Sequence, residues 1–240
     1  MGVPCTRRLK VNKALSEEFL LQGAFYSMEQ AGHLLQDAVL LFNRKRYASS
    51  LALASYSLEE MGRARIMMGN VFKVHEGGIV TGPALDREVK FGGAKAHLRK
   101  LKRGQRSGSL WQLCGLLTAQ ANPQGSSGPL HLRRVSSSVE HSEAVTQLKG
   151  QVAAEIFEMR MRALYVDRAV DGTRWYRPFE ISRHEALVLL KRVSRDYRAD
   201  RKGYRRLQKR IELSNECGYS GWSSRPKLPR SIFQGARRCA

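Results

Sequence analysis

Apolar residues recur at helical spacing along most of the chain. Between residues 15 and 42 they step by three or four positions in a stretch without proline, which predicts a long amphipathic helix. A second stripe of the same spacing begins at Tyr47, after a short basic corner, and continues until Gly77 and Gly78. The two stripes predict a pair of antiparallel helices joined by the corner.

The middle of the chain shows two further helical patterns. Residues 83–103 have helical spacing that Gly92 and Gly93 interrupt, which leaves 94–103 as the firmer half. After a Gly- and Ser-rich stretch, apolar residues return at helical spacing over 145–166. Each segment is therefore expected to form a helix.

A capping signal marks the start of the last long helix. Ser182 and Glu185 have the spacing of a capping box, in which each side chain bonds a backbone N–H at the helix start. The apolar stripe that follows covers 186–211. Apolar and polar residues alternate with a period of two only over short stretches. This pattern allows at most a small strand pair near Val166 and Trp175. The fold class is therefore expected to be an all-α bundle with long antiparallel helices.

Composition divides the chain into a helical domain with two basic ends. Residues 1–13 form a basic N-terminal arm, and 14–212 form the helical domain. Within it, residues 104–138 are rich in Gly, Ser, Asn and Pro and predict a loop-rich insertion with one short helix over 110–121. Residues 213–240 are basic and rich in Ser, Gly and Pro, a composition typical of a flexible tail.

The charge indicates an anionic partner. The chain has 42 Lys and Arg against 21 Asp and Glu, a net charge of +21 at pH 7. The excess is concentrated in 1–13, 84–106, 191–210 and 225–238, and the rest of the chain is nearly neutral. Clustered cations favour a phosphate-binding surface, with nucleic acid as the leading partner. An acidic protein, a membrane surface or a solvated helix face are the alternatives.

Several classes of function find no support in the sequence. The four cysteines lie far apart and form no metal-ligand spacing, so neither a metal site nor a disulfide framework is expected. No apolar run is long enough to span a bilayer, and no export signal is visible, which predicts a cytoplasmic protein without a membrane partner. Nucleotide-binding and zinc-protease motifs are absent, and no cofactor is expected.

An adjacent pair of glutamates lies in the second predicted helix. Glu59 and Glu60 precede Arg63, at i,i+4 and i,i+3, so both carboxylates can pair with this arginine on the helix surface. Considered alone, such a surface ion pair contributes only a few tenths of a kcal/mol.

The surrounding stretch, RYASSLALASYSLEEMGRA, resembles the second helix of AbiV-type abortive infection proteins, a HEPN-like group of bacterial antiphage defence. Residues 96–101 resemble the family's His-x-x-Lys-Leu element, and 163–167 resemble its Tyr-Val-Asp segment. The three blocks have the family's order, and the resemblance covers roughly 34–185. The residues that match family motifs are Glu59, Glu60, Arg63, Tyr165, Asp167 and Pro178.

The resemblance implies a HEPN-like helical bundle, a homodimer, and a role in abortive infection that acts on RNA or the translation machinery. Some HEPN proteins are metal-independent ribonucleases with an Arg-x4–6-His motif, which makes His97 the candidate catalytic residue. His97 lacks an arginine at the permitted positions, and the formal matches at His141 and His184 are no more than chance predicts. Tyr165 and Asp167 are more typical of a helix end than of catalysis.

The cations around His97 are the candidate RNA-binding residues. They are Lys95, Arg99, Lys100, Lys102 and Arg103. Two functions follow from this arrangement. One is a ribonuclease in which His97 acts as general acid or base. The other is a non-catalytic module that binds RNA, the ribosome or a phage protein, with His97 as a structural residue.

Overall fold

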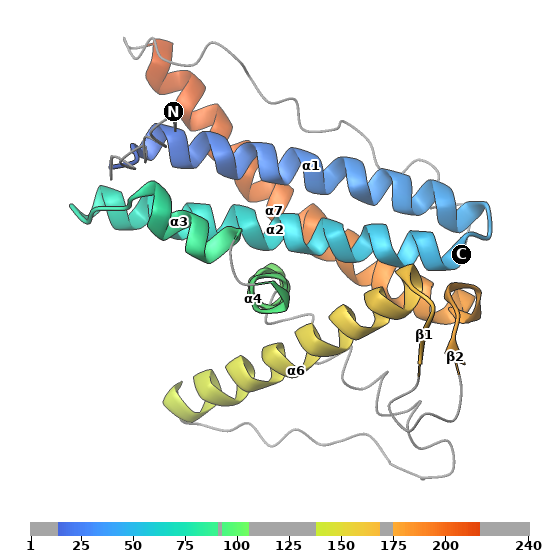
Figure 1. Ribbon diagram of the computed structural model, residues 1–240. Helices are drawn as coiled ribbons and strands as arrows, with labels where there is room; N and C mark the ends of the chain where they lie inside the picture. The colour runs from blue at the N-terminus through green and yellow to red at the C-terminus, as the bar shows by residue number, and fades with distance from the viewer. Residues whose placement is uncertain (1–13, 91–92, 106–137, 169–174, 217–240) are drawn as a thin grey trace, which may run out of the picture.

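Long helices make up most of the computed structural model, which describes residues 14–90, 93–105, 138–168 and 175–216. This arrangement is the expected all-α bundle, and Figure 1 shows it. In chain order the elements are α1 (Glu17–Asn43), α2 (Tyr47–His75), α3 (Gly82–Val89), α4 (Ala94–Gly104), α6 (Ser138–Leu164), β1 (Asp167–Arg168), β2 (Trp175–Tyr176), the 3-10 helix η1 (Pro178–Glu180) and α7 (Arg183–Glu216).

Small residues hold α1 and α2 together as the predicted antiparallel hairpin. Ala24, Ala31 and Ala38 are fully buried at seven-residue intervals on α1. Opposite them on α2, the Ser50 hydroxyl donates to the Ala38 carbonyl and the Ser57 hydroxyl donates to the Ala31 carbonyl, each at 2.7 Å. Short side chains let the two backbones approach, and the buried hydroxyls are satisfied by the same approach. The helices lie side by side along their length in Figure 1.

The other long helices cover the apolar sides of this hairpin. Ile156 of α6 and Val193 of α7 are fully buried in the main core. Phe25 of α1 and Tyr204 of α7 meet edge to face, with ring centroids 5.5 Å apart. A smaller apolar cluster lies under α3, where Leu85 packs with residues of α1 and α2.

Two glycines allow α2 and α4 to cross with their backbones in contact. A Cβ added at Gly62 would lie 1.9 Å from the carbonyl oxygen of Lys100. A Cβ added at Gly104 would lie 2.2 Å from the carbonyl oxygen of Leu58. No other residue type fits at either position without movement of the backbone. The crossing fixes α4 against the middle of α2, where it is seen nearly end-on in Figure 1.

The local signals in the second half of the chain are confirmed. β1 and β2 pair antiparallel with Asp167 opposite Tyr176. Ser182 and Glu185 form the capping box: the Ser182 amide donates to the Glu185 carboxylate at 2.7 Å, and the Glu185 amide donates to the Ser182 hydroxyl at 3.2 Å. Because α7 continues to Glu216, the predicted domain boundary between residues 212 and 213 falls inside a helix.

Parts of the sequence prediction lie outside the described residues. They are the basic arm 1–13, the insertion with its short helix over 110–121, and the tail from residue 217. Among the described helices, none combines the length and the apolar character that a bilayer span requires.

The close crossing at Gly62 predicts that replacing glycine by alanine has opposite effects on stability at different positions of α2. Gly62→Ala should lower the free energy of unfolding by about 1–3 kcal/mol, because the new methyl group overlaps backbone atoms of α4. Gly69→Ala, in the same helix, is the matched control, since nothing lies within 4 Å of its added Cβ. It should raise the free energy of unfolding by roughly 0.5–1 kcal/mol. Urea denaturation measures both values, and equal effects at the two positions would contradict the close crossing.

Candidate functional site

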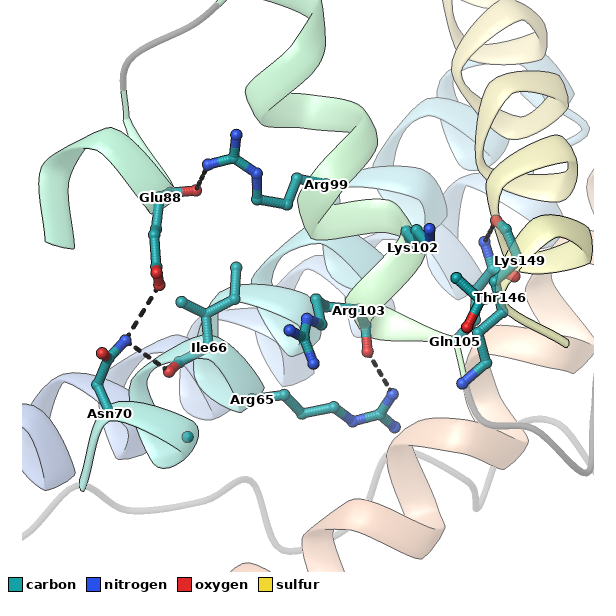
Figure 2. Close-up of a pocket in the computed structure, with 11 residues that line it drawn as sticks. Arg65, Ile66, Asn70, Glu88, Arg99, Lys102, Arg103, Gln105, Thr146 and Lys149 are labelled. Carbon is teal, nitrogen blue, oxygen red and sulfur yellow. Dashed lines mark hydrogen bonds between the residues drawn. The ribbon is translucent and has the colours of Figure 1, made fainter. Parts of the chain in front are cut away.

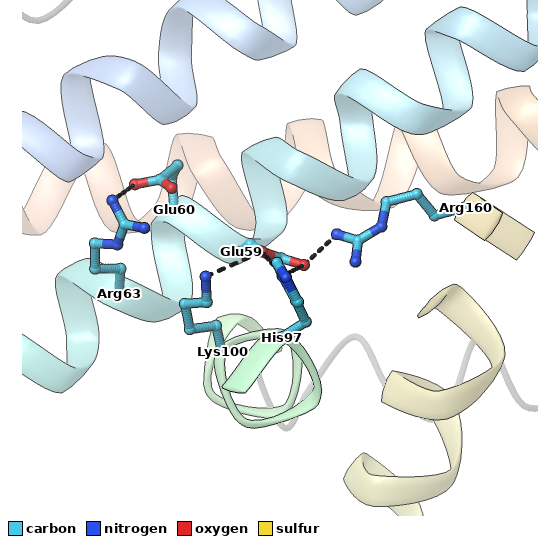
Figure 3. Close-up of polar contacts among 6 residues, drawn as sticks. All are labelled: Glu59, Glu60, Arg63, His97, Lys100 and Arg160. Carbon is cyan, nitrogen blue, oxygen red and sulfur yellow. Dashed lines mark hydrogen bonds and ion pairs between the residues drawn. The ribbon is translucent and has the colours of Figure 1, made fainter. Parts of the chain in front are cut away.

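A buried carboxylate lies where α2, α4 and α6 meet. Glu59 of α2 is only 2% exposed. Its carboxylate contacts Nδ1 of His97 at 2.9 and 3.0 Å, Nζ of Lys100 at 3.2 Å and a terminal guanidinium nitrogen of Arg160. Figure 3 shows the three side chains converging on Glu59 from α4 and α6. We call these four residues the Glu59 cluster.

The cluster stabilises the ionised form of Glu59. Burial alone would raise the pKa of this carboxyl. The hydrogen bond from His97 and the charges of Arg160 and Lys100 together have a larger, opposite effect, so the pKa lies below its ordinary value of 4.5. The adjacent Glu60 differs. The pKa of Glu60 is raised, mainly because burial removes water from its carboxyl. The charge of Arg63 offsets this effect only in part.

The placement of the two glutamates corrects one expectation. Glu59 and Glu60 were both expected on the helix surface beside Arg63. Glu60 does pair with Arg63, at 3.1 Å, but Glu59 points into the bundle and bonds α4 and α6. Packing explains why Glu59 is buried, because the close crossing of α4 at Gly62 covers the side of α2 that carries Glu59.

Aromatic rings enclose the arginine of the cluster. The Arg160 guanidinium carbon lies 4.7 Å from the ring centroid of Tyr56 and 4.9 Å from that of Phe157. The Phe157 ring also lies beside His97, with 6.1 Å between centroids. Cation–π contacts and the ion pair together compensate for burying the charge of Arg160, which is 2% exposed.

His97 is the most accessible member of the cluster. Its side chain is 40% exposed, whereas those of Glu59, Lys100 and Arg160 are at most 6% exposed. Contact of Nδ1 with a carboxylate orients the imidazole and favours the proton on that nitrogen. The other ring nitrogen, Nε2, is then the one able to accept a proton. The geometry is compatible with acid–base chemistry and equally with a structural role.

A basic pocket lies on the far side of α4 from the Glu59 cluster. Its volume is about 850 Å³. Figure 2 shows Arg99, Lys102 and Arg103 of α4 on one side of this space, Arg65 of α2 below it, and Lys149 of α6 beside it. The other residues that line it are Ile66, Gly69, Asn70, Glu88, Gln105 and Thr146. Among the described lining residues there are thus five cations and one carboxylate, that of Glu88.

The cations of the pocket are only partly neutralised. Arg65 is held by Asp200 of α7, with Nε at 3.0 Å. Within the part of the chain that the structure describes, Lys102, Arg103 and Lys149 form no salt bridge. Burial lowers the pKa of Lys149, and the charges of Arg65, Arg103 and Lys102 lower it further. Mutually repelling cations around a hollow are an arrangement that a bound anion would relieve.

The predicted RNA-binding residues do not form one surface. Arg99, Lys102 and Arg103 line the basic pocket, whereas the exposed Lys95 does not. Lys100 was expected to contact RNA, and here the structure corrects the prediction: this lysine is 5% exposed and its ammonium group bonds Glu59. Helix geometry explains the division, because Lys100 lies on the side of α4 that faces α2.

The remaining motif residues follow the C-terminal end of α6. Tyr165 is exposed just after this helix, and its amide donates to the Met161 carbonyl at 2.9 Å, as expected for a helix end. Asp167 belongs to β1, and Pro178 begins η1. Neither Tyr165 nor Pro178 contributes to the Glu59 cluster or lines the basic pocket.

Three important cations were not predicted from the sequence. Arg160 follows Val152 and Ile156 at intervals of four, so it occupies a buried position of the α6 stripe, and a charge at such a position was the available signal. Arg65 and Lys149 join the basic pocket from helices other than α4. No sequence spacing relates these two residues to Arg103.

Comparison with known proteins agrees with the helical bundle and with the family resemblance of the three sequence blocks. The family model described as AbiV matches residues 19–198, most of the chain and more than the resemblance over 34–185. The chain belongs to the AbiV family. It is an AbiV-type HEPN protein, and this membership indicates abortive-infection defence. Neither the curated proteins nor the solved structures give a match.

The match also covers both candidate sites of the AbiV chain. The Glu59 cluster and the basic pocket lie entirely within residues 19–198. Among the described helices, the first two residues of α1 and the end of α7 lie outside the match. The two sites are therefore built from the family's part of the chain and not from its basic ends.

The Glu59 cluster predicts that neutralising its carboxylate is costly. Glu59→Gln should lower the free energy of unfolding by roughly 3–5 kcal/mol at pH 7, because Lys100 and Arg160 would remain buried without a counter-charge. Glu60→Gln is the matched control and should be close to neutral, since the environment of Glu60 already disfavours its charge. Chemical denaturation measures both variants.

The effect of Glu59→Gln on the free energy of unfolding should depend on pH. A carboxyl whose pKa is lowered by folding stabilises the protein above its unfolded pKa, near 4.5, and loses this contribution as the pH falls through the folded value. The difference between wild type and Glu59→Gln should therefore be constant from pH 7 to about 5 and should shrink below 4.5. A difference that grew on acidification would contradict the ionised cluster.

Proposed function

We propose that this AbiV protein binds RNA, free or within the ribosome, through its basic pocket, and that this binding blocks translation in an infected cell. The observation that carries the proposal is the pocket of about 850 Å³ whose described lining contains five cations, contributed by α2, α4 and α6, and one carboxylate. Arrest of translation would stop the infected cell before phage matures, which is the outcome that abortive infection requires.

The charge of the pocket fits a polyanion better than a small neutral ligand. Neutralising several phosphates releases their counterions, which is the main source of RNA affinity for basic proteins. The cations that line the pocket come from three helices, α2, α4 and α6. A chain of phosphates can therefore contact more than one cationic group.

Binding without cleavage is the better supported mechanism at this pocket. Among the described residues that line it, none is a histidine. His97 bonds Glu59 from the opposite side of α4, so its imidazole is separated from the pocket by the helix itself. The cytoplasmic location, the homodimer and a phage-protein partner stay predictions.

The binding proposal predicts selective loss of affinity. Arg103→Ala and Lys149→Ala should each weaken binding of a short RNA several-fold and reduce the slope of log affinity against log salt by about one per phosphate contact. Arg44→Ala is the control, because Arg44 is exposed at the end of α1 and does not line the pocket. Fluorescence anisotropy at several salt concentrations measures the effect. Equal losses in all three variants would indicate attraction by net charge and not by the pocket.

A ribonuclease is the second candidate, and one observation favours it. His97 is oriented by a carboxylate and partly exposed, as a general acid or base must be. In that case His97→Asn, which keeps a donor toward Glu59, should abolish RNA cleavage but leave RNA affinity unchanged. Cleavage should persist with EDTA, since an imidazole mechanism needs no metal. Intact total RNA after incubation with the wild-type protein would exclude this candidate.

A further inference from the structure

The outer side of α1 exposes large apolar side chains at a regular interval. Phe19, Tyr26 and Leu40 are between 44% and 59% exposed. His33, which is also exposed, completes a series in which each member follows the previous one by seven residues. Seven residues make nearly two full turns of an α-helix, with a drift of only about 20°. The four side chains therefore form one line along the helix, which we call the α1 stripe.

Packing within the bundle accounts for the buried side of α1 but not for the stripe. Tyr26, His33 and Leu40 each lie two positions after one of the buried alanines that face α2, which places them about 200° further around the helix. Within the described residues, the main neighbours of α1 are α2 and α7. Figure 1 shows α1 at one edge of the bundle and α6 at the opposite edge.

The length of the stripe distinguishes it from ordinary surface residues. Single exposed apolar side chains are normal on a protein and need no explanation. Here they continue in one line from Phe19 to Leu40, which is about 32 Å of helix. Side-by-side helices contact each other at seven-residue intervals, the same interval as in the stripe. The stripe therefore has the length and the spacing of a surface that receives another helix.

The charge of α1 is opposite to that of the whole chain. Over Glu17–Asn43 the helix has four acidic residues and neither Lys nor Arg, although the chain has a net charge of +21. Glu29 follows Tyr26 by three positions and Asp37 follows His33 by four, so both carboxylates flank the stripe. The stripe is thus an apolar line with acidic flanks on a strongly basic protein.

This charge decides which kind of partner fits. Carboxylates repel the phosphates of a nucleic acid and of an anionic lipid surface. A second copy paired along the same stripe would bring two acidic helices together, and neither helix has a lysine or arginine to compensate. A helix with an apolar face and basic flanks matches both the stripe and its carboxylates.

We propose that the α1 stripe is a docking surface for a cationic amphipathic helix of another protein. The apolar face of that helix covers Phe19, Tyr26 and Leu40. Its Lys or Arg side chains pair with Glu29 and Asp37. About three heptads of the partner are needed to cover the stripe. None of the described residues that line the basic pocket belongs to α1, so this docking is independent of RNA binding.

A designed peptide of three heptads tests the surface. The probe consists of Leu and Lys with every Leu on one face of the helix, and the control peptide has the same composition with its Leu residues distributed around the helix. Fluorescence anisotropy with the full-length protein should show at least roughly tenfold tighter binding of the probe, because only the probe presents a continuous apolar face. Equal affinities would mean attraction by charge alone and would overturn the proposal.

Substitutions in the stripe should weaken binding of the probe selectively. Tyr26→Ser and Leu40→Ser should each lower its affinity roughly five- to tenfold, because each removes an apolar contact. Ile79→Ser is the matched control, since Ile79 is also a large exposed apolar residue but lies outside α1. Thermal melting checks that all three variants are folded. A loss of the same size in the Ile79 variant would show that the probe does not recognise the stripe.

The acidic flank has a test of its own. Asp37→Asn should weaken binding of the probe at low salt and should equal wild type at about 1 M salt, where charges are screened beyond roughly 3 Å. The loss caused by Leu40→Ser should persist at both salt concentrations, because an apolar contact is not screened. A loss in the Asp37 variant that ignores salt would contradict pairing with basic residues of the partner.

Sedimentation of the protein alone examines the other occupant. If it forms a dimer that Leu40→Ser dissociates and Ile79→Ser does not, the stripe receives a second copy and the proposed partner is wrong. A sedimentation coefficient that Leu40→Ser leaves unchanged, together with binding of the probe, supports the cationic helix. RNA affinity should be the same in all the α1 variants, so failure of this proposal leaves the proposed function standing.

Discussion

The ionised carboxylate of Glu59 is the constraint on which the centre of the molecule depends. A charge with 2% exposure is tolerated only when its partners are as well placed as water would be. Here the partners come from two other helices, His97 and Lys100 from α4 and Arg160 from α6. The carboxylate therefore specifies how three helices meet, and the glycine crossing of α2 and α4 brings them close enough to do so.

That arrangement divides α4 into two sides with different purposes. Its inner side bonds Glu59 and stabilises the fold, and its outer side lines a hollow with cations that have little neutralisation. The cations of this one short helix thus have two different roles. Some of its cations are structural and inaccessible, while the others are available to an anionic ligand, which is the physical basis for proposing RNA as the partner of this AbiV protein.

The elements could be predicted from sequence because their signals are local. Helical spacing, Gly92 and Gly93, and the capping box at Ser182 depend only on neighbouring residues, and the helices formed where these signals indicated. The site was less predictable. Lys100 and Arg103 look alike in the sequence, and only the direction in which α4 packs decides which is buried. Arg160 and Glu59 are 101 residues apart, so their contact follows from tertiary packing that no local pattern encodes.

The backbone contact at Gly62 and Gly104 has a consequence for the length of α4. Each residue of an α-helix turns the following side chains by about 100°. With both glycines seated against the other helix, an insertion or deletion of one residue between Lys100 and Gly104 would rotate Lys100 and the preceding residues relative to Gly104. Cations now in contact with solvent would turn toward the core, and Glu59 would lose its lysine. Side chains on the outer side of α4 can therefore be substituted, but residues cannot be inserted or deleted between its two contact points with α2.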